Sequence, residues 1–359
     1  MRLLQLKADN YRLFQDLSLL PHSRLNFFYG ANAAGKTSLL EAIYTLGRAK
    51  SFRGSSPADL AGTQGKHWTL FGRVSEGAAA NAVGHRLGVG WANSETTIRI
   101  DNQAANSLEL LKQLSVQVLE PGMHRVLQDG PTYRRSFLDW GVFHVEHQFM
   151  PIWRRYKRAL RQRNQALRNN AGDRDLAAWE PELAEAGEAL TALREHHLGQ
   201  IQNRCVHYVA ELLSEGDWSF DLHPGWPRGS SLKESLIKNR GNDRRMGLTQ
   251  VGPHRAELRI RADSHAIKYR ISRGQQKLLI AAMLLAQSEE IGQITGQHPL
   301  LLVDDFGAEL ADQYQQALLN ALQRYPGQVF VTAFEKMPVL ATITDASMFH
   351  VERGVLRSI

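Results

Sequence analysis

The sequence comprises 359 residues, with 43 basic and 36 acidic side chains, a formal net charge of +7 and 43% hydrophobic residues. This composition excludes a disordered chain and provides enough apolar residues for one large domain or two modest ones. The longest apolar run, residues 278–286, is too short to span a bilayer, and residues 1–10 lack the layout of a signal peptide. We therefore expect a cytoplasmic protein without membrane partners. The single cysteine, Cys205, excludes an internal disulfide framework.

Strand and helix patterns alternate along the chain and are interrupted once by a long helical stretch. Residues 25–29 predict a buried strand and residues 38–46 a helix. The next β-rich segments predict an antiparallel sheet over residues 69–74, 86–91 and 96–100. Helical periodicity then dominates residues 134–213. Further on we expect a helix at 274–291 and strands at 256–261, 267–270, 300–303, 330–332 and 348–351.

Charge is unevenly distributed within the helical stretch. Residues 151–170 carry seven basic side chains and no acidic one, and residues 171–200 carry seven acids against two arginines. Together with apolar residues at heptad-compatible spacing, this pattern predicts a short antiparallel helical hairpin of roughly 25 to 40 Å. Two interpretations of the basic helix stay open: its arginines pair with the acidic helix, or they lie along a DNA backbone. The latter interpretation uses the stripe formed by Arg154, Arg158, Arg161 and Arg168.

A second basic region, residues 240–277, holds ten basic residues against three acids. Few aromatic residues lie between these basic residues, so stacking on bases is not expected. Any DNA binding there should be electrostatic and largely independent of base sequence. Because it leads directly into a motif described below, we take it as the sharper candidate for DNA contact.

The strongest chemical signal is a phosphate loop that matches G-x-x-x-x-G-K-[ST] between a strand and a helix. Its residues, with the first position of the following helix, are Gly30, Ala31, Asn32, Ala33, Ala34, Gly35, Lys36, Thr37 and Ser38. The glycines allow several amides to point inward at a helix N-terminus, which creates an anion site. Lys36 then places a positive charge on the β and γ phosphates of ATP, and Thr37 offers a hydroxyl to Mg²⁺.

An apolar strand at residues 300–303 ends in two acids, as in a Walker B element. Asp304 is expected to hold Mg²⁺, and Asp305 to orient or deprotonate the attacking water. Lys36, Asp304 and Asp305 are therefore the predicted catalytic residues, and Thr37 and Asp304 the predicted metal ligands. Since aspartate is shorter than glutamate, we expect slow hydrolysis.

A third motif begins at Ser272 and continues through Gly274 and Gln275 into an apolar helix. It resembles the signature motif of ABC-type ATPases, in which this segment clamps the nucleotide held by the opposite protomer. The alternative is a serine that only caps a helix.

With these elements in this order, the chain resembles the RecF family of bacterial DNA replication and repair proteins. Further family-like stretches occur at residues 10–12, 50–53, 121–122, 130–139 and 251–258. The resemblance implies an α/β fold: an ABC-type P-loop ATPase head with an antiparallel β subdomain and an inserted helical lobe. We place the head at residues 1–132 and 246–359, and the lobe at residues 133–245.

The resemblance also implies function. It indicates a weak DNA-linked ATPase that dimerises on ATP, binds gapped DNA or single-strand/double-strand junctions, and helps to load a recombinase. The implied partners are DNA, a second copy of the chain, and the mediators RecR and RecO. Tyr11 and Arg12 are weaker candidates for contacts near the nucleotide.

The sequence departs from the family pattern at three places. Ala33 replaces a glycine of the phosphate loop, Gly122 replaces an acid, and residues 308–311 read Ala-Glu-Leu-Ala where the family usually has Ser-Glu-Leu-Asp. Two other function classes remain as alternatives: the nucleotide-binding subunit of a transporter, and a chromosome-organising ATPase. The latter needs a much longer coiled coil than the predicted hairpin.

Overall fold

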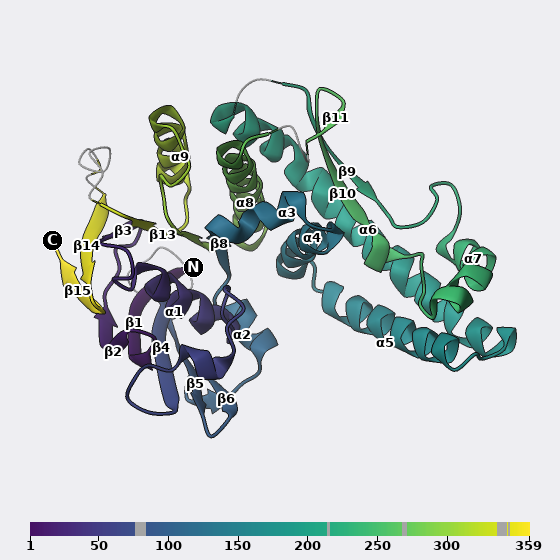
Figure 1. Cartoon of the computed structure of the whole chain (residues 1–359), viewed down its shortest axis with the longest axis horizontal. Coiled ribbons are helices and arrows are strands. Elements are labelled where there is room, and N and C mark those ends of the chain that lie inside the picture. The colour runs from purple at the N-terminus through teal and green to yellow at the C-terminus, as the bar shows by residue number, and fades with distance from the viewer. Residues whose placement is uncertain (76–83, 214–215, 268–270, 336–342, 344) are drawn as a thin grey trace. The chain divides into compact units, whose positions relative to one another are not determined.

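The computed structural model describes residues 1–75, 84–213, 216–267, 271–335, 343 and 345–359 (Figure 1). It divides into two compact units, one formed by Met1–Met123 with Arg273–Ile359 and the other by His124–Ser272. The inserted unit thus begins at His124 rather than at 133, and ends at Ser272 rather than at 245. Its later end follows from strand pairing, because β10 (Glu257–Ala262) pairs antiparallel with β9 (Trp218–His223) inside this unit.

The first unit contains two six-stranded sheets. Its strands are β1 (Arg2–Tyr11), β2 (Phe14–Leu19), β3 (Leu25–Tyr29), β4 (His67–Ser75), β5 (Gly84–Ala92), β6 (Glu95–Ile100), β7 (Gln103–Ala104), β8 (Val116–Leu119), β12 (Leu300–Val303), β13 (Val329–Ala333), β14 (Ala346–Glu352) and β15 (Val355–Ser358). Its helices are α1 (Lys36–Arg48), α2 (Ser107–Gln113), α8 (Arg273–Thr295) and α9 (Asp312–Arg324), with short 3₁₀ turns η1 (Pro57–Leu60) and η2 (Pro121–His124), the latter ending at the boundary.

One sheet is antiparallel, in the order β2-β1-β4-β5-β6-β7, which confirms the antiparallel β subdomain. The other has the order β15-β14-β3-β13-β12-β8, in which β14, β3, β13, β12 and β8 run parallel. The carboxyl ends of parallel strands meet at one edge of a sheet, and ligands of open α/β sheets bind there. The segments that follow β3, β12 and β13 therefore come together although they are far apart in sequence.

Helix α1 lies between the two sheets and supplies much of the core of this unit. Its residues Leu39, Leu40, Ile43 and Leu46 are buried in one cluster with side chains from both sheets. Full burial of such a side chain contributes about 1.5–3 kcal/mol. This packing fixes the start of α1, and with it the phosphate loop.

The second unit is mainly helical. Its elements are α3 (Arg125–Gln128), α4 (Pro131–Val145), α5 (Phe149–Arg168), α6 (Asp173–Leu212), α7 (Leu232–Met246), η3 (Pro253–Arg255), β9, β10 and β11 (His265–Ala266). Strand β11 ends before the strand expected at 267–270, and most of that stretch lies outside the described residues.

Helices α5 and α6 confirm the predicted hairpin, because they follow one another closely and pack side by side (Figure 1). The 20 residues of α5 correspond to about 30 Å. Tyr156 and Leu160 of α5 are buried with Leu183 and Leu190 of α6 in one apolar cluster. Among the helices that the structure describes, none is both long and apolar enough to cross a membrane.

Buried charges join three helices of this unit. The Arg163 side chain of α5 is fully buried, and it contacts Asp243 of α7 at 2.7 Å and Glu180 of α6 at 3.2 Å. Arg240 of α7 reaches the same Glu180 carboxylate at 2.5 Å. Because buried ions are tolerated only when they are paired and hydrogen-bonded, these residues are fixed partners within the fold.

Candidate nucleotide-binding site

The phosphate loop connects β3 to α1 and has an unusual backbone. Gly30 has φ 154°, and a Cβ at this position would lie 2.2 Å from the carbonyl oxygen of Val351, so only glycine fits. Gly35 has φ 115° and forms the N-cap of α1 without a side-chain cap. Ala33 also has a positive φ, 60°, at the position where the family usually has glycine. The alanine therefore adopts the loop conformation at some cost in backbone strain.

Lys36 is the first residue of α1, and its side chain extends back over the phosphate loop. Its Nζ atom donates hydrogen bonds to the carbonyl oxygens of Gly30 at 2.7 Å and Ala31 at 2.9 Å, and the residue is only 6% exposed. Burial lowers the pKa of Lys36, while the carboxylates of Asp305 and Asp304 act in the opposite direction. The Lys36 ammonium group thus lies against the phosphate loop. A bound phosphate can replace the two carbonyl oxygens as the acceptor of its hydrogen bonds.

Asp304 follows β12 and is the centre of a buried polar cluster. Its Oδ1 atom accepts hydrogen bonds from Thr37 Oγ1 at 3.1 Å and Thr332 Oγ1 at 2.7 Å. The residue is 3% exposed, and burial raises the pKa of its carboxyl group. A hydrogen bond therefore joins the two predicted metal ligands, Thr37 and Asp304, although they are far apart in sequence.

Asp305 has a left-handed backbone, with φ 50°. Its amide donates to Thr332 Oγ1 at 3.0 Å, and its carbonyl oxygen accepts from Lys277 Nζ at 2.7 Å. It also lines a cavity of about 280 Å³ together with Phe334 and Gln315. Non-glycine residues in this conformation are uncommon, and at functional sites they persist because surrounding groups hold them in place.

Sequence reasoning missed the roles of Thr332 and Lys277. Thr332 is a polar residue at the end of the otherwise apolar strand β13, and Lys277 is a cation in the almost entirely buried helix α8. Each is a polar residue in an otherwise apolar, buried element, and this pattern could have marked both as residues with a specific partner. The sequence shows that such a residue needs a partner, but it does not show which one.

The signature segment lies at the start of α8. Ser272 is exposed and directly precedes the helix. A Cβ on Gly274 would lie 2.6 Å from the carbonyl oxygen of Glu309, so the helix start packs against the loop that follows Asp305. Lys277 Nζ also donates to the carbonyl oxygen of Ala308 at 3.2 Å. The start of helix α8 therefore packs against and hydrogen-bonds to residues 305–309, which follow the Walker B strand of the same chain.

Tyr11 and Arg12 have partners within the first unit. The Tyr11 hydroxyl lies 2.9 Å from Thr45 Oγ1, and burial raises its pKa. Arg12 makes two hydrogen bonds to the buried Glu41 carboxylate, at 2.8 and 2.9 Å. These contacts give both residues a structural role.

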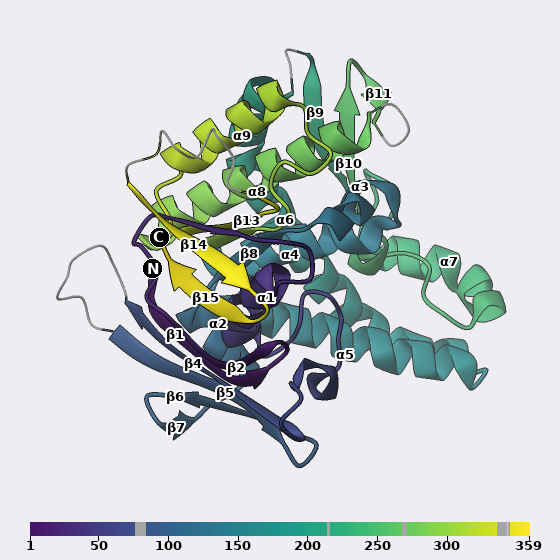
Figure 2. The same cartoon turned by 60° about the vertical axis from the view of Figure 1, so that its left-hand side comes forward.

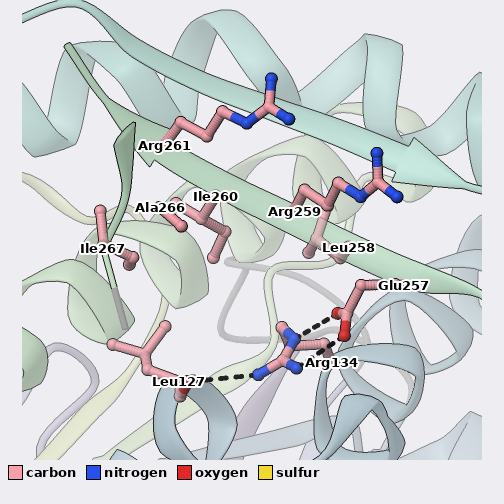
Figure 3. Close-up of a pocket in the computed structure, with 9 residues that line it drawn as sticks. All are labelled: Leu127, Arg134, Glu257, Leu258, Arg259, Ile260, Arg261, Ala266 and Ile267. Atoms are coloured by element: carbon pink, nitrogen blue, oxygen red, sulfur yellow. Dashed lines mark hydrogen bonds and ion pairs between the residues drawn. The ribbon is translucent and has the colours of Figure 1, made fainter. Parts of the chain in front are cut away.

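The Arg134 side chain is held inside the second unit. It forms a bidentate pair with Glu257 at 2.6 and 2.9 Å and donates to backbone carbonyls, including that of Leu127 (Figure 3). These contacts make Arg134 a structural residue of this unit. Asp139, on the same helix, pairs with Arg194 at 2.7 Å.

The donor set around the phosphate loop fits ATP with Mg²⁺. Magnesium prefers hard oxygen ligands, which the Thr37 hydroxyl and the Asp304 carboxylate provide. The bound ion supplies positive charge to the phosphate oxygens. Lys36 would hold the β and γ phosphates, the amides at the start of α1 would donate to them, and Asp305 would orient water.

The two-sheet head, the phosphate loop, the Walker B acids and the signature helix define an ABC-type ATPase head. A family model described as the RecF/RecN/SMC N terminal domain matches residues 2–357. The chain belongs to this family.

Known relatives agree with this assignment over the full length. The chain is 39% identical to the DNA replication and repair protein RecF of Pseudomonas aeruginosa (strain LESB58), with 99% of this chain and 97% of that protein covered. It is also 39% identical to the protein of the same name from Stenotrophomonas maltophilia (strain R551-3), with 99% and 98% covered.

Solved structures show the same fold. A structure titled as the recombination mediator protein RecF-ATP in the RecFOR pathway matches with a TM-score of 0.86 and 25% identity, covering 100% of this chain and 97% of that one. An Smc head bound to the C-winged helix domain of ScpA matches with a TM-score of 0.62 and 14% identity, with 100% and 97% covered. The latter likeness concerns the fold alone.

Proposed function

We propose that the protein is an ATP-dependent DNA-binding protein of recombinational repair and replication restart. The observation that carries this proposal is the hydrogen bond between Thr37 and Asp304, which places a phosphate loop and a Walker B acid together. It occurs in a chain that resembles RecF proteins over 99% of its length. ATP with Mg²⁺ is the cofactor, and the protein acts in the cytoplasm.

ATP hydrolysis in this proposal is weak and depends on Asp305. The short aspartate side chain extends from a backbone held by Thr332 and Lys277, so its reach is limited. Lys36 and the amides of the phosphate loop bind and orient the triphosphate. Asp305→Asn should therefore keep ATP binding and lose most of the turnover.

Dimerisation in this proposal depends on the signature segment. Ser272, Gly274 and Gln275 close on the nucleotide bound by a second copy of the chain, using a serine hydroxyl and a helix N-terminus. The ATP-bound dimer grips gapped DNA or single-strand/double-strand junctions and helps to load a recombinase. The solved relative is titled as part of the RecFOR pathway, which supports RecR and RecO as partners here.

The test measures dimerisation and binding to gapped DNA with and without ATP. We expect ATP to promote both in the wild type. Lys36→Ala should lose them together with ATP binding, whereas Ser272→Ala should bind ATP as a monomer and fail to dimerise.

Ser231→Ala provides the matched control, because Ser231 caps helix α7 through the Glu234 amide. It should cost about 1 kcal/mol of stability and leave ATP-dependent dimerisation intact. If ATP does not promote wild-type dimers, or if the two serine variants behave alike, the shared-site mechanism is wrong.

A further inference from the structure

The basic region at residues 240–277, which the sequence favoured for DNA contact, has much of its charge engaged inside the protein. Arg240 pairs with Glu180 and Asp173, and Arg244 also pairs with Asp173. Lys277 is buried and donates to backbone carbonyls. Lys268 and Arg270 lie outside the described residues. Of the exposed arginines, Arg273 lies 3.9 Å from Glu309, and Arg245 and Arg255 donate to the Asn242 and Gln250 side chains. Two more, Arg259 and Arg261, are exposed on β10 (Figure 3).

Helix α5 shows the opposite situation. Of its seven basic residues, only Arg155 and Arg163 form ion pairs with acids of α6. The four arginines of the sequence stripe are exposed and, within the described part of the chain, have no ion pair or side-chain hydrogen bond. We call this set the α5 stripe; it consists of Arg154, Arg158, Arg161 and Arg168.

The geometry of the α5 stripe suits a polyanion. Residues spaced by 4, 3 and 7 positions share one face of a helix, and the stripe extends about 21 Å along the axis at 1.5 Å per residue. The Glu182 carboxylate is close enough for Arg158 to help lower its pKa, but its two oxygens already accept hydrogen bonds from Arg155. A row of unpaired arginines therefore faces solvent.

We propose that the α5 stripe binds the sugar–phosphate backbone of duplex DNA, independently of base sequence. This inference rests on the proposed function and names the surface that carries its DNA contact. About 21 Å of duplex carries roughly 12 phosphates on its two strands, at one charge per ~1.7 Å. Four arginines on one face of a helix can follow one strand of such a duplex, because guanidinium groups bind phosphate oxygens in a bidentate way.

Two other polyanions fit the same surface less well. A helix that inserts into a membrane surface needs exposed apolar side chains, but Tyr156, Leu160 and Leu167 of α5 are buried. Single-stranded DNA is bound by stacking on exposed aromatic rings. Trp153, the aromatic residue next to the stripe, is half-buried, and the Lys157 ammonium lies 5.3 Å from its ring centroid. The exposed face thus offers charge without a stacking platform.

The experiment uses the full chain with ATP and compares two double variants. Arg158→Gln/Arg161→Gln removes two charges from the α5 stripe, and Arg259→Gln/Arg261→Gln removes two exposed charges from β10. Glutamine is a good helix former, so α5 should stay folded. Affinity for a random-sequence duplex is measured over a range of salt concentrations, and binding of ATP is measured in parallel.

We expect the stripe variant to bind duplex on the order of 50-fold more weakly at 0.1 M salt, since each phosphate contact contributes about 0.9 to the salt exponent. Its log–log salt slope should be shallower by about 1.8. The β10 variant should change affinity less than threefold, and both variants should bind ATP normally.

Several results would overturn the inference. Wild-type affinity for duplex in the stripe variant refutes it, as does a larger loss in the β10 variant. A loss of binding to vesicles of anionic phospholipid with DNA binding retained would assign the surface to membranes instead. If the wild type itself binds no DNA with ATP present, the proposed function fails, and this inference fails with it.

Discussion

Lys277→Met should slow ATP hydrolysis much more than it weakens ATP binding. The Lys277 Nζ atom donates hydrogen bonds to the carbonyl oxygens of Asp305 at 2.7 Å and Ala308 at 3.2 Å, which belong to the Walker B segment and not to the phosphate loop. Methionine keeps the volume and the apolar stem and removes both hydrogen bonds. The left-handed backbone of Asp305 then loses its hydrogen bond to the ammonium group and keeps those to Thr332 Oγ1 and the Ala308 amide.

The size of the effect follows from these contacts. A hydrogen bond from a charged donor contributes about 1.5–3 kcal/mol, and the strain at a left-handed aspartate is of order 1–3 kcal/mol. Desolvation of the buried ammonium, which also lowers the pKa of Lys277, offsets part of this. If about 1.5–3 kcal/mol is lost from the positioning of Asp305, kcat falls roughly 10- to 150-fold.

The assay separates binding from turnover. Steady-state kcat and KM are measured with the equilibrium affinity for ATP, for wild type, Lys277→Met and Lys112→Met. Lys112 is an exposed lysine of α2 in the same unit, so its variant makes the same change of charge at a distant position. A kcat within twofold of wild type for Lys277→Met, or a loss of ATP affinity as large as the loss of kcat, would refute this positioning role.

Three further outcomes are expected. Arg163→Met should lower the free energy of unfolding by about 3–5 kcal/mol in urea titrations, because it removes the ion-pair partner of the buried Asp243 and leaves the buried Glu180 with Arg240 alone. Arg155→Met, at an exposed pair, should cost less than about 1 kcal/mol, and equal losses would contradict the reasoning. Burial lowers the pKa of His254 from 6.5 to about 4, so stability should be level above pH ~6.5 and decrease by up to about 3 kcal/mol as the pH falls towards 4, a slope that His254→Gln should reduce. Ala33→Gly should raise thermal stability by up to about 1 kcal/mol while ATP binding persists, and a lower stability would show that φ 60° is unstrained there.

The parts of the site that the sequence could predict are those encoded in short segments. The phosphate loop needs a strand, eight residues and a helix in direct succession, and Asp304 and Asp305 directly follow an apolar strand. Such local patterns determine local backbone geometry, and the parallel sheet then brings them together.

Contacts between distant segments could not be predicted in this way. The opposite charges of the basic and acidic segments suggested pairing between these two helices, but they did not show that Arg163 pairs with Asp243 of α7 as well as with Glu180 of α6. The side on which each arginine projects decides whether it is buried, and that depends on how α5, α6 and α7 pack. Residue-level partners such as Thr332 for Asp305 likewise arise only once β12 and β13 are adjacent.

The strand order of the parallel sheet also has a consequence for synthesis of the chain. Strand β3, which carries the phosphate loop, lies between β13 and β14, and Figure 2 shows β14 next to the C-terminal strand β15. The Gly30 amide donates to the carbonyl oxygen of Phe334, and the Gly354 amide donates to that of Ala34. A nascent chain emerging from the ribosome therefore carries its phosphate loop early but cannot complete it until these late segments emerge. We therefore expect ATP to stabilise the full-length chain and not a nascent chain that ends before Phe334.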